Sequence, residues 1–223
     1  MSESTAAPID LPDPSEDPLS DAPTRKRPKP GERRVQILQM LATMLEQPGG
    51  ERITTAALAA RLEVSEAALY RHFASKAQMF EGLIDFIEQT VFSLINQIVE
   101  KESADAGPAT GSRQARRIAG MLVQFAEKNP GMARVMVGDA LVLENERLQQ
   151  RMNALFDKVE STIKQCLRDA ALLAPAGSSV PDPQVQAATV VAFVSGRLQR
   201  YARSGFKRLP SEHLDAGLAL ILG

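Results

Sequence analysis

The residues of this chain best suited to bind another molecule lie within residues 53–76, which read ITTAALAARLEVSEAALYRHFASK. In the second half of this stretch, helical spacing predicts one outward face that carries Glu66, Ala67, Tyr70, Arg71 and His72. Small residues at the start of a helix allow it to enter a DNA major groove, and donors further along can reach the flanking phosphates. The pattern therefore predicts a surface that binds duplex DNA.

Two short helices that meet at a sharp corner must position these groups. The pattern predicts one helix over residues 54–62, a break at 63–65 and a second helix over 66–73. The apolar residues fall at spacings that bury one side of each helix: Leu58, Leu62, Val64, Leu69 and Phe73. Three alanines are expected to let the two helices approach closely: Ala57, Ala59 and Ala60. The sequence thus predicts a helix-turn-helix.

Hydroxyl residues mark the start of each helix. Thr54 and Ser65 are placed to accept hydrogen bonds from backbone amides of the helix that follows. Ser75 and Gln78 have the spacing of a capping box, so a third helix is expected to begin at Lys76. The free amides at that start and the Lys76 ammonium form an anion site, which a DNA phosphate would occupy.

Residues 64–80, VSEAALYRHFASKAQMF, resemble the DNA-binding signature of the TetR family of dimeric bacterial regulators. The family pattern runs Val-Ser, small residues, Leu-Tyr, a variable residue, His-Phe and Ser-Lys. The resemblance implies an all-α, TetR-like fold, with a three-helix head that contains the helix-turn-helix and a helical dimerisation body. Where the family usually has Gly in the turn, this chain has Glu63. If the turn requires a left-handed backbone conformation at this position, we expect Glu63 to be strained.

Individual roles in DNA binding follow from this resemblance and from the predicted helix faces. Thr55, Tyr70 and Lys76 are expected to contact phosphates, and His72 is expected to lie at the rim. The positions expected to meet base edges are Ser65, Glu66, Ala67 and Ala68. The remaining candidate DNA-binding residues are Thr54 and Arg71. Small side chains predict that apolar contacts and DNA shape contribute to the readout.

Length, hydropathy and cysteine content exclude several classes of protein. The 223 residues are 44% hydrophobic, enough for a small head and a larger helical body. The apolar runs are too short to span a bilayer and the start lacks a secretory signal, so we expect a cytoplasmic protein with no membrane partner. Cys166 is the single cysteine, and neither metal-ligand spacing nor a nucleophile with its base is found. We therefore expect no cofactor, no metal site and no enzymatic activity.

Charge is strongly segregated along the chain, although the formal net charge is -1. Residues 1–24 hold six acidic residues, five prolines and no Lys or Arg, a composition that predicts disorder. A basic stretch follows: Arg25, Lys26, Arg27, Lys29, Arg33 and Arg34. It is expected to follow phosphates or enter a minor groove, and a solvated linker is the alternative. Residues 1–31 are thus assigned as a disordered acidic tail and a basic arm.

Periodicity and chain breakers outline the other helices. The DNA-binding domain is expected over residues 32–75 and begins with a helix over 32–46. The buried stripe of that helix is predicted to contain Val35, Leu38, Leu41, Ala42 and Leu45. A regulatory and dimerisation domain is expected over residues 76–223. Its helices are predicted over residues 76–101, 113–128, 132–137, 141–173, 184–204 and 211–222.

The last two helices carry more apolar surface than one helix pair can bury. A two-fold four-helix bundle would bury it, so we expect a homodimer through these helices, as in TetR-like proteins. Two heads held in this way would read palindromic DNA with half-sites roughly 34–36 Å apart. Five cations at the end of the first of these helices are interpreted as a solvated face that complements the helix dipole: Arg197, Arg200, Arg203, Lys207 and Arg208. His213 receives no role.

A second resemblance is carried by three segments: residues 52–88, 125–160 and 204–210. They are similar to bacterial nucleoid occlusion factors. This implies a nucleoid-associated, DNA-bound dimer that binds the tubulin-like protein FtsZ and prevents assembly of the division ring over the chromosome. The FtsZ surface would include Phe86, Lys128 and Asn129, although Phe86 could instead pack on the back of the first helix. A TetR-type repressor released from its operator by a small apolar ligand is the other function left open.

Overall fold

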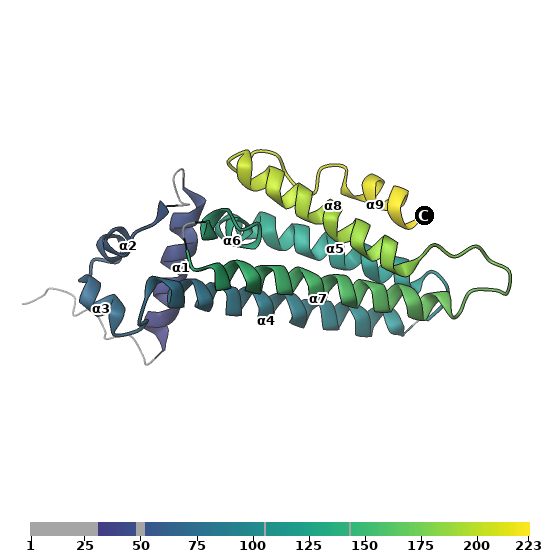
Figure 1. Cartoon of the computed structure of the whole chain (residues 1–223), viewed down its shortest axis with the longest axis horizontal. Helices are drawn as coiled ribbons and strands as arrows, with labels where there is room; N and C mark the ends of the chain where they lie inside the picture. Colours follow the sequence, from purple (N-terminus) through teal and green to yellow (C-terminus); the bar gives the residue numbers. More distant parts are fainter. Residues whose placement is uncertain (1–30, 48–51, 105, 143) are drawn as a thin grey trace, which may run out of the picture.

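Two helical units form the part of the chain described by this computed structural model, residues 31–47, 52–104, 106–142 and 144–223. The head contains α1 (Glu32–Glu46), α2 (Thr55–Arg61) and α3 (Glu66–Tyr70). The body contains α4 (Lys76–Ser103), α5 (Thr110–Lys128), α6 (Pro130–Met136), the 3-10 helix η2 (Asp139–Leu141), α7 (Glu146–Ala171), α8 (Pro183–Arg203) and α9 (Leu214–Leu222). The head lies at one end of the elongated body (Figure 1). Every regular element in these ranges is a helix, which confirms the all-α fold class.

Two side-chain caps fix the corner between α2 and α3. The Thr54 hydroxyl accepts a hydrogen bond from the Ala57 amide at 3.1 Å, and the Ser65 hydroxyl accepts one from the Ala68 amide at 3.2 Å. Both caps confirm the predictions. The turn between the helices places Glu63 at φ 54°, in the left-handed region that costs about 1–2 kcal/mol for residues other than glycine. The expected strain at Glu63 is therefore present.

Helix α3 is shorter than the predicted 66–73. It ends at Tyr70, and the chain tightens because the His72 amide donates to the Leu69 carbonyl at 2.9 Å. Phe73 follows this turn and is 1% exposed, so it remains part of the core as predicted. Because α3 is short, every residue of its outward face lies near one of its ends. The start of the helix is held by the Ser65 cap, and its end by the bond between the His72 amide and the Leu69 carbonyl.

Helix α1 has the predicted limits, but its buried face is rotated. Ile37, Leu41 and Leu45 are buried, whereas Val35 is 53% exposed, so the prediction for Val35 was wrong. The reason is that α1 packs against α6 as well as α2 and α4, which shifts the centre of its contact stripe. The three alanines of α2 were all expected at the close contact between α2 and α3. Only Ala59 is buried, whereas Ala57 and Ala60 are exposed, so the prediction was wrong for those two.

Helix α4 connects the head to the body. The Ser75 hydroxyl accepts from the Gln78 amide at 3.1 Å, which confirms the predicted start. The Gln78 side chain accepts in turn from the Ala74 amide at 2.7 Å, one residue earlier than in a standard capping box. Further along, α4 crosses α1 closely, because a Cβ atom on Gly82 would lie 3.1 Å from the Leu38 methyl groups. The head therefore rests on the first turns of α4.

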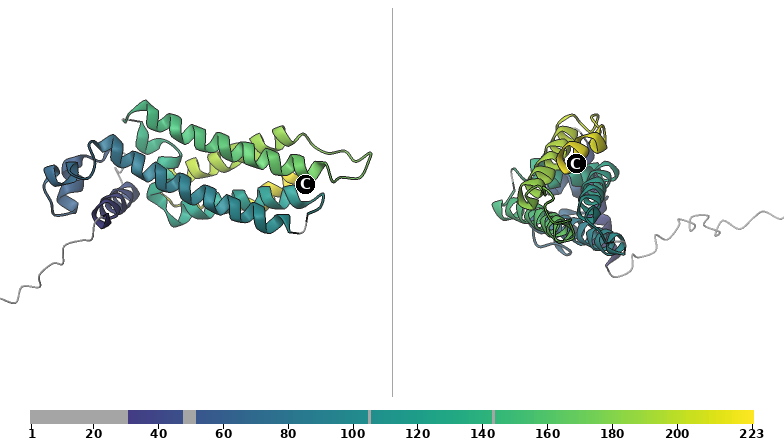
Figure 2. Two further views of the ribbon diagram at one scale, coloured as in Figure 1. Left: turned by 90° about the horizontal axis from the view of Figure 1, so that it is seen from below. Right: turned by 90° about the vertical axis from the view of Figure 1, so that its right-hand side faces the viewer.

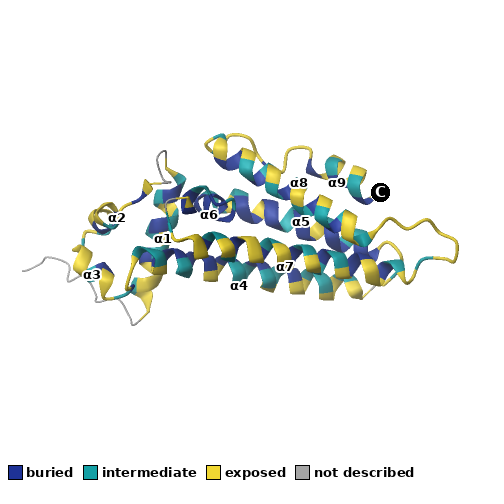
Figure 3. Ribbon diagram, viewed as in Figure 1, coloured by how far each residue is buried: buried dark blue, intermediate teal, exposed yellow. Residues whose placement is uncertain are grey.

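The helix predicted over residues 141–173 begins later, at Glu146. Gly138 at φ 83° turns the chain into η2, and the Asn145 side chain then caps α7 by accepting from the Arg147 amide at 2.9 Å. The chain therefore turns at Gly138, forms the short helix η2 and is capped anew at Asn145, so α7 begins at Glu146. Figure 3 shows that α5 lies deep in the body, whereas α7 exposes one side along its length.

The C-terminal helices leave apolar side chains on the surface. Val185 of α8 is 60% exposed and Leu220 of α9 is 90% exposed. Helix α9 begins at Leu214 rather than at the predicted Ser211, since the chain turns through His213, which has φ 56°. None of the described helices is long and apolar enough to cross a membrane.

Two of the features predicted from sequence lie outside the described residues. They are the acidic tail over residues 1–24 and the arm residues 25–29. Arg33 and Arg34 of the basic stretch are described, as part of α1.

Candidate nucleic-acid interface

The outward face of α3 lies at the tip of the head. Figure 2 shows α2 and α3 at the end of the molecule, beyond the helices of the body. Glu66, Ala67, Tyr70 and Arg71 are exposed, and His72 is partly buried, so the structure brings the predicted face together on one surface. Ser65 and Ala68 at its start are joined by the cap described above. Ala67 and Ala68 keep the first turn of α3 small beside Glu66, which leaves room for an approach to base edges.

Three of the candidate residues form a hydrogen-bonded cluster across the corner. The Thr55 hydroxyl donates to a Glu66 carboxylate oxygen at 2.7 Å. The Tyr70 hydroxyl lies 3.5 Å from the Thr55 hydroxyl oxygen. The cluster thus connects the first residue of α2 to both ends of α3. The surface position of these residues was predicted from the sequence, but their pairing was not, because side chains eleven residues apart meet only after the corner forms.

The cluster sets the charge and the available hydrogen bonds of the site. Glu66 is in the first turn of α3, where the positive end of the helix dipole favours a carboxylate. A carboxylate in a major groove can accept from the amino group of cytosine, and it repels phosphates. The arrangement therefore favours base contact by Glu66 and phosphate contact by the hydroxyl groups beside it. Thr54 points its own hydroxyl at the Ala57 amide, so its role in the structure is that of a cap.

Lys76 is already paired with a carboxylate of the body. Its ammonium forms an ion pair with Glu144, in the segment between η2 and α7. The same nitrogen lies 5.7 Å from the centre of the Phe80 ring. Contact between Lys76 and a phosphate would thus compete with Glu144, a partner that the local sequence does not predict because it lies 68 positions away.

Arg34 holds the C-terminal end of α3 rather than extending away from the head. Its guanidinium donates to the His72 carbonyl and lies 4.1 Å from the centre of the Phe73 ring. The basic arm predicted from sequence included this residue among groups that follow phosphates. The structure gives it a positioning contact behind α3.

A buried arginine joins the head to the body. Arg134 of α6 is 9% exposed and donates to the Leu45 and Gln47 carbonyls, both at 2.8 Å. These carbonyls are at the C-terminal end of α1, where the helix dipole favours a cation. The guanidinium also lies 4.9 Å from the Phe206 ring centre, beyond α8. No sequence signal marked Arg134, because an arginine in a seven-residue helix has no distinctive spacing.

The candidate protein-binding residues lie on two elements of the body. Phe86 of α4 is 47% exposed, so the proposal that it packs on the back of helix one was wrong. Lys128, at the end of α5, is exposed, and the Asn129 side chain donates to the Phe125 carbonyl at 2.8 Å. The start of α4 and the end of α5 both lie beside the head (Figure 1).

An ion-pair network lies directly beside Phe86. Arg151 of α7 donates to Asp85 at 2.8 Å and to Glu88 at 2.7 Å. Burial acts to lower the pKa of Arg151, but the hydrogen bonds and charges of the two carboxylates outweigh it and raise that pKa. The network ties α4 to α7 and places charged groups one and two positions from Phe86 on α4, with one more carboxylate than guanidinium.

Two of the hollows among the described residues lie between long helices of the body. A cavity of about 210 Å³ lies between α4, α5 and α7, beside Gln114 and Cys166. Burial raises the pKa of the Cys166 thiol to about 11, so the thiol is a neutral packing group. An open groove of about 700 Å³ lies between α7 and α8, beside Phe156 and Gly196. Among the described residues there is no group of His, Cys, Asp and Glu that could hold a metal ion.

Comparison with known families matches both units. Residues 37–83 match the protein family of bacterial regulatory proteins, tetR family. Residues 112–222 match the tetracyclin repressor-like C-terminal domain. Together the two matches cover the helix-turn-helix and most of the body.

Curated relatives share about half of the residues. The chain is 51% identical over 184 residues to the nucleoid occlusion factor SlmA of Idiomarina loihiensis, covering 82% of this chain and 90% of the relative. It is 50% identical over 183 residues to the nucleoid occlusion factor SlmA of Shewanella amazonensis, covering 82% and 89%.

Solved structures show the same fold at lower identity. The TetR family regulator PfmR of Thermus thermophilus superposes with a TM-score of 0.64 at 20% identity, over 85% of this chain and 95% of that one. The fatty acid degradation regulator FadR of Bacillus halodurans gives 0.66 at 12% identity, over 86% and 96%. The TetR-like architecture predicted from the signature is thereby confirmed.

Proposed function

The chain belongs to the TetR family of DNA-binding regulators, with the SlmA nucleoid occlusion factors among its relatives, and we propose that it binds palindromic chromosomal sites as a homodimer and antagonises FtsZ. Its function is that of a DNA-binding nucleoid occlusion factor, rather than that of a ligand-released repressor or an enzyme. Located in the cytoplasm and associated with the nucleoid, the dimer would keep the division ring away from DNA.

The observation that carries the proposal is the exposed, capped face of α3 on a chain about half identical to nucleoid occlusion factors. We assign residues 32–75 as the DNA-binding domain and residues 76–223 as the regulatory and dimerisation domain. Ser65, Ala67 and Ala68 would lie against base edges together with Glu66. Phosphates would be bound by Thr55, Tyr70 and Lys76, with His72 at the rim and Arg71 as a further DNA-binding residue.

The Lys76 assignment has a direct test. Replacing Lys76 by Ala should weaken binding to all DNA sequences and flatten the plot of log affinity against log salt by about one unit. The measurement is fluorescence anisotropy with a cognate and an unrelated duplex over a range of salt. An effect confined to the cognate duplex would reject a phosphate contact.

Dimerisation is supported by the apolar side chains that α8 and α9 expose. Val185 and Leu220 are well exposed, although they lie on helices that otherwise pack into the body. Pairing of these helices with those of a second copy would bury both and hold two heads about one helical turn of DNA apart, roughly 34–36 Å. Palindromic sites follow from that symmetry.

The FtsZ surface that we propose is centred on Phe86. An exposed aromatic ring with a polar border has the composition of a binding hot spot, and Arg151 with its two carboxylates supplies that border. Lys128 and Asn129, at the end of α5, would supply polar contacts for the same partner.

The proposal is tested by mixing the purified protein with FtsZ and GTP, with and without a cognate duplex, and measuring polymer by light scattering. Loss of polymer that depends on the duplex is expected. Phe86→Ala should abolish that loss while leaving DNA affinity unchanged. Leu172→Ala is the control, since Leu172 is 80% exposed at the far end of α7. Unchanged polymer in every mixture would refute the FtsZ role.

A further inference from the structure

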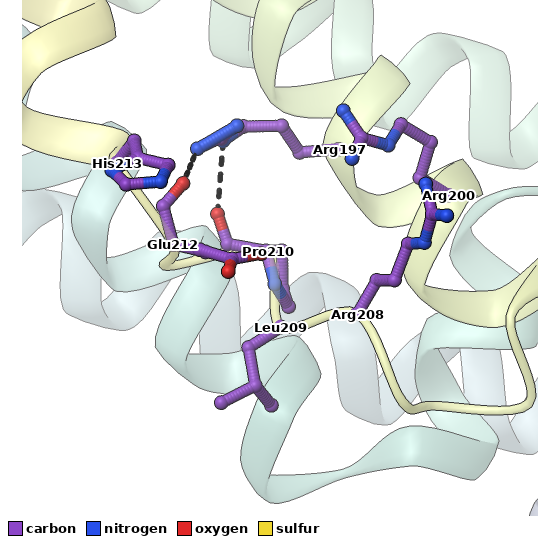
Figure 4. Close-up of a pocket in the computed structure, with 7 residues that line it drawn as sticks. All are labelled: Arg197, Arg200, Arg208, Leu209, Pro210, Glu212 and His213. Atoms are coloured by element: carbon purple, nitrogen blue, oxygen red, sulfur yellow. Dashed lines mark hydrogen bonds between the residues drawn. The ribbon is translucent and has the colours of Figure 1, made fainter.

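The end of α8 and the loop after it concentrate positive charge. Arg197, Arg200 and Arg208 line one pocket of about 70 Å³ together with His213 (Figure 4). Glu212 is the one carboxylate of the lining, so at least two positive charges there are not neutralised within the pocket. The ion pairs found among the described residues have Lys76, Arg113, Arg117 and Arg151 as their cations, and these do not line the pocket.

The helix dipole explains only part of this cluster. Arg200 lies in the last turn of α8, where the negative end of the dipole favours a cation. Arg208 lies beyond the helix, and Arg197 turns toward the loop to donate to the Pro210 carbonyl at 2.9 Å and to the Glu212 carbonyl. The Arg197 guanidinium also lies 4.7 Å from the Phe193 ring centre. The interpretation as a solvated face was therefore wrong for Arg197, whose contacts shape the pocket wall.

Hydrogen bonds hold the loop in its shape. The Ser204 hydroxyl accepts from the Lys207 amide at 3.1 Å and from the Arg208 amide at 2.9 Å. The Ser211 amide donates to the Glu127 carboxylate of α5 at 2.9 Å. Arg208 is thus fixed at the base of its side chain, which rises toward Arg200 in Figure 4.

Unusual backbone geometry frames the same loop. Phe206 and His213 have φ values of 65° and 56°, in the left-handed region that side chains with a Cβ atom rarely adopt. Phe206 is held there by its edge contact with Tyr201, at 5.1 Å between ring centres, and by Arg134. Strained residues of this kind persist where the surroundings impose them, and they cluster at binding sites.

We propose that this pocket binds the phosphate group of an anionic ligand. Guanidinium groups present paired donors that match phosphate oxygens, and three of them surround one small space. The pocket volume admits a group of a few heavy atoms, so the rest of the ligand would remain outside. Burial and the charge of Arg200 lower the pKa of Arg197, and a bound anion would offset the second of these effects.

The ligand has two possible sources, a free phosphate compound or the backbone of DNA that passes the head. The pocket is separate from the α3 face and from Phe86, so phosphate binding there can be tested independently of the proposed function; only the DNA source rests on that function. Loss of the pocket would leave the helix-turn-helix and its caps unchanged.

Pyrophosphate titrated into the full-length protein by calorimetry, at constant ionic strength, tests the proposal. The variants are Arg208→Gln, with Arg200→Gln as a second change in the lining, and Arg203→Gln as the control. Arg203 is an exposed arginine of the same helix end that does not line the pocket. We expect the wild type and the control to bind pyrophosphate, and each lining variant to bind about tenfold more weakly or worse.

DNA binding by the same variants identifies the source. A salt slope lowered by about one unit in Arg208→Gln, but not in Arg203→Gln, would assign the pocket to a DNA phosphate. An unchanged slope together with lost pyrophosphate binding would assign it to a free phosphate compound. No binding by the wild type, or equal weakening by control and lining variants, would overturn the proposal.

Discussion

The head and the body are stabilised in different ways. Helix α5 of the body buries ten of its 19 residues, whereas α3 of the head buries Leu69 alone among five. The head compensates with directed contacts: the caps at Thr54 and Ser65, the bond from Arg34 to the His72 carbonyl, and the bonds from Arg134 to the end of α1. A surface that must stay exposed for DNA is thus held by a few anchors, while the body depends on a packed core.

The largest expected effect separates the two units. Leu122→Ala in α5 and Leu69→Ala in α3 each remove a side chain that is 1% exposed, and each should cost about 2–5 kcal/mol locally. The first should lower the urea midpoint of the whole protein. The second should abolish DNA binding while most of the helical circular dichroism of the body keeps its midpoint. If both variants shifted the whole transition equally, the head and body would unfold as one unit, and the distinction between their modes of stabilisation would be wrong.

Replacing Arg134 by Met tests the anchor between the units. The change keeps the apolar stem but leaves the Leu45 and Gln47 carbonyls without their charged donor, which should cost about 2–3 kcal/mol. Thermal unfolding should show the loss, and DNA affinity should fall because α1 is no longer held. Arg147→Met, at an exposed position of α7, is the matched control and should change neither.

Relief of the strained turn should stabilise the head. Glu63→Gly removes the penalty of φ 54°, and we expect a gain of about 1 kcal/mol, reduced by the greater freedom of glycine in the unfolded chain. Differential scanning calorimetry is the measurement. A variant less stable than the wild type would show that the contacts of the Glu63 side chain outweigh its backbone strain.

The smallest effect concerns the link between Lys76 and the body. Glu144→Gln should free the Lys76 ammonium for a phosphate and raise DNA affinity by about fivefold, the upper end of the roughly 0–1 kcal/mol that exposed ion pairs contribute, because the Glu144 side chain is only 9% exposed. Anisotropy titrations at low salt would detect it. Glu146→Gln removes a nearby exposed charge that does not pair with Lys76, so a similar gain in that control would indicate a general charge effect.

Local patterns predicted much of the fold and part of the site. Caps at Thr54, Ser65 and Ser75 depend on residues three positions apart, so the sequence contains the whole signal. Periodicity located the helices but not the face of α1, because the buried stripe of α1 is set by its packing against α6 as well as α2 and α4, and α6 lies far along the chain. Thr55 and Glu66 were not predicted to pair because only the folded corner brings them together, and Lys76 and Glu144 because they lie 68 positions apart.

The contact of α6 with α1 also limits how the two units can be recombined. A Cβ atom on Gly131 would lie 2.0 Å from the Ala42 carbonyl oxygen, so nothing larger than hydrogen fits between the helices. A chimaera that grafts a foreign head onto this body would therefore need a matching α6. Exchange of DNA specificity between such regulators should succeed more readily by altering the surface of α3 than by swapping whole modules.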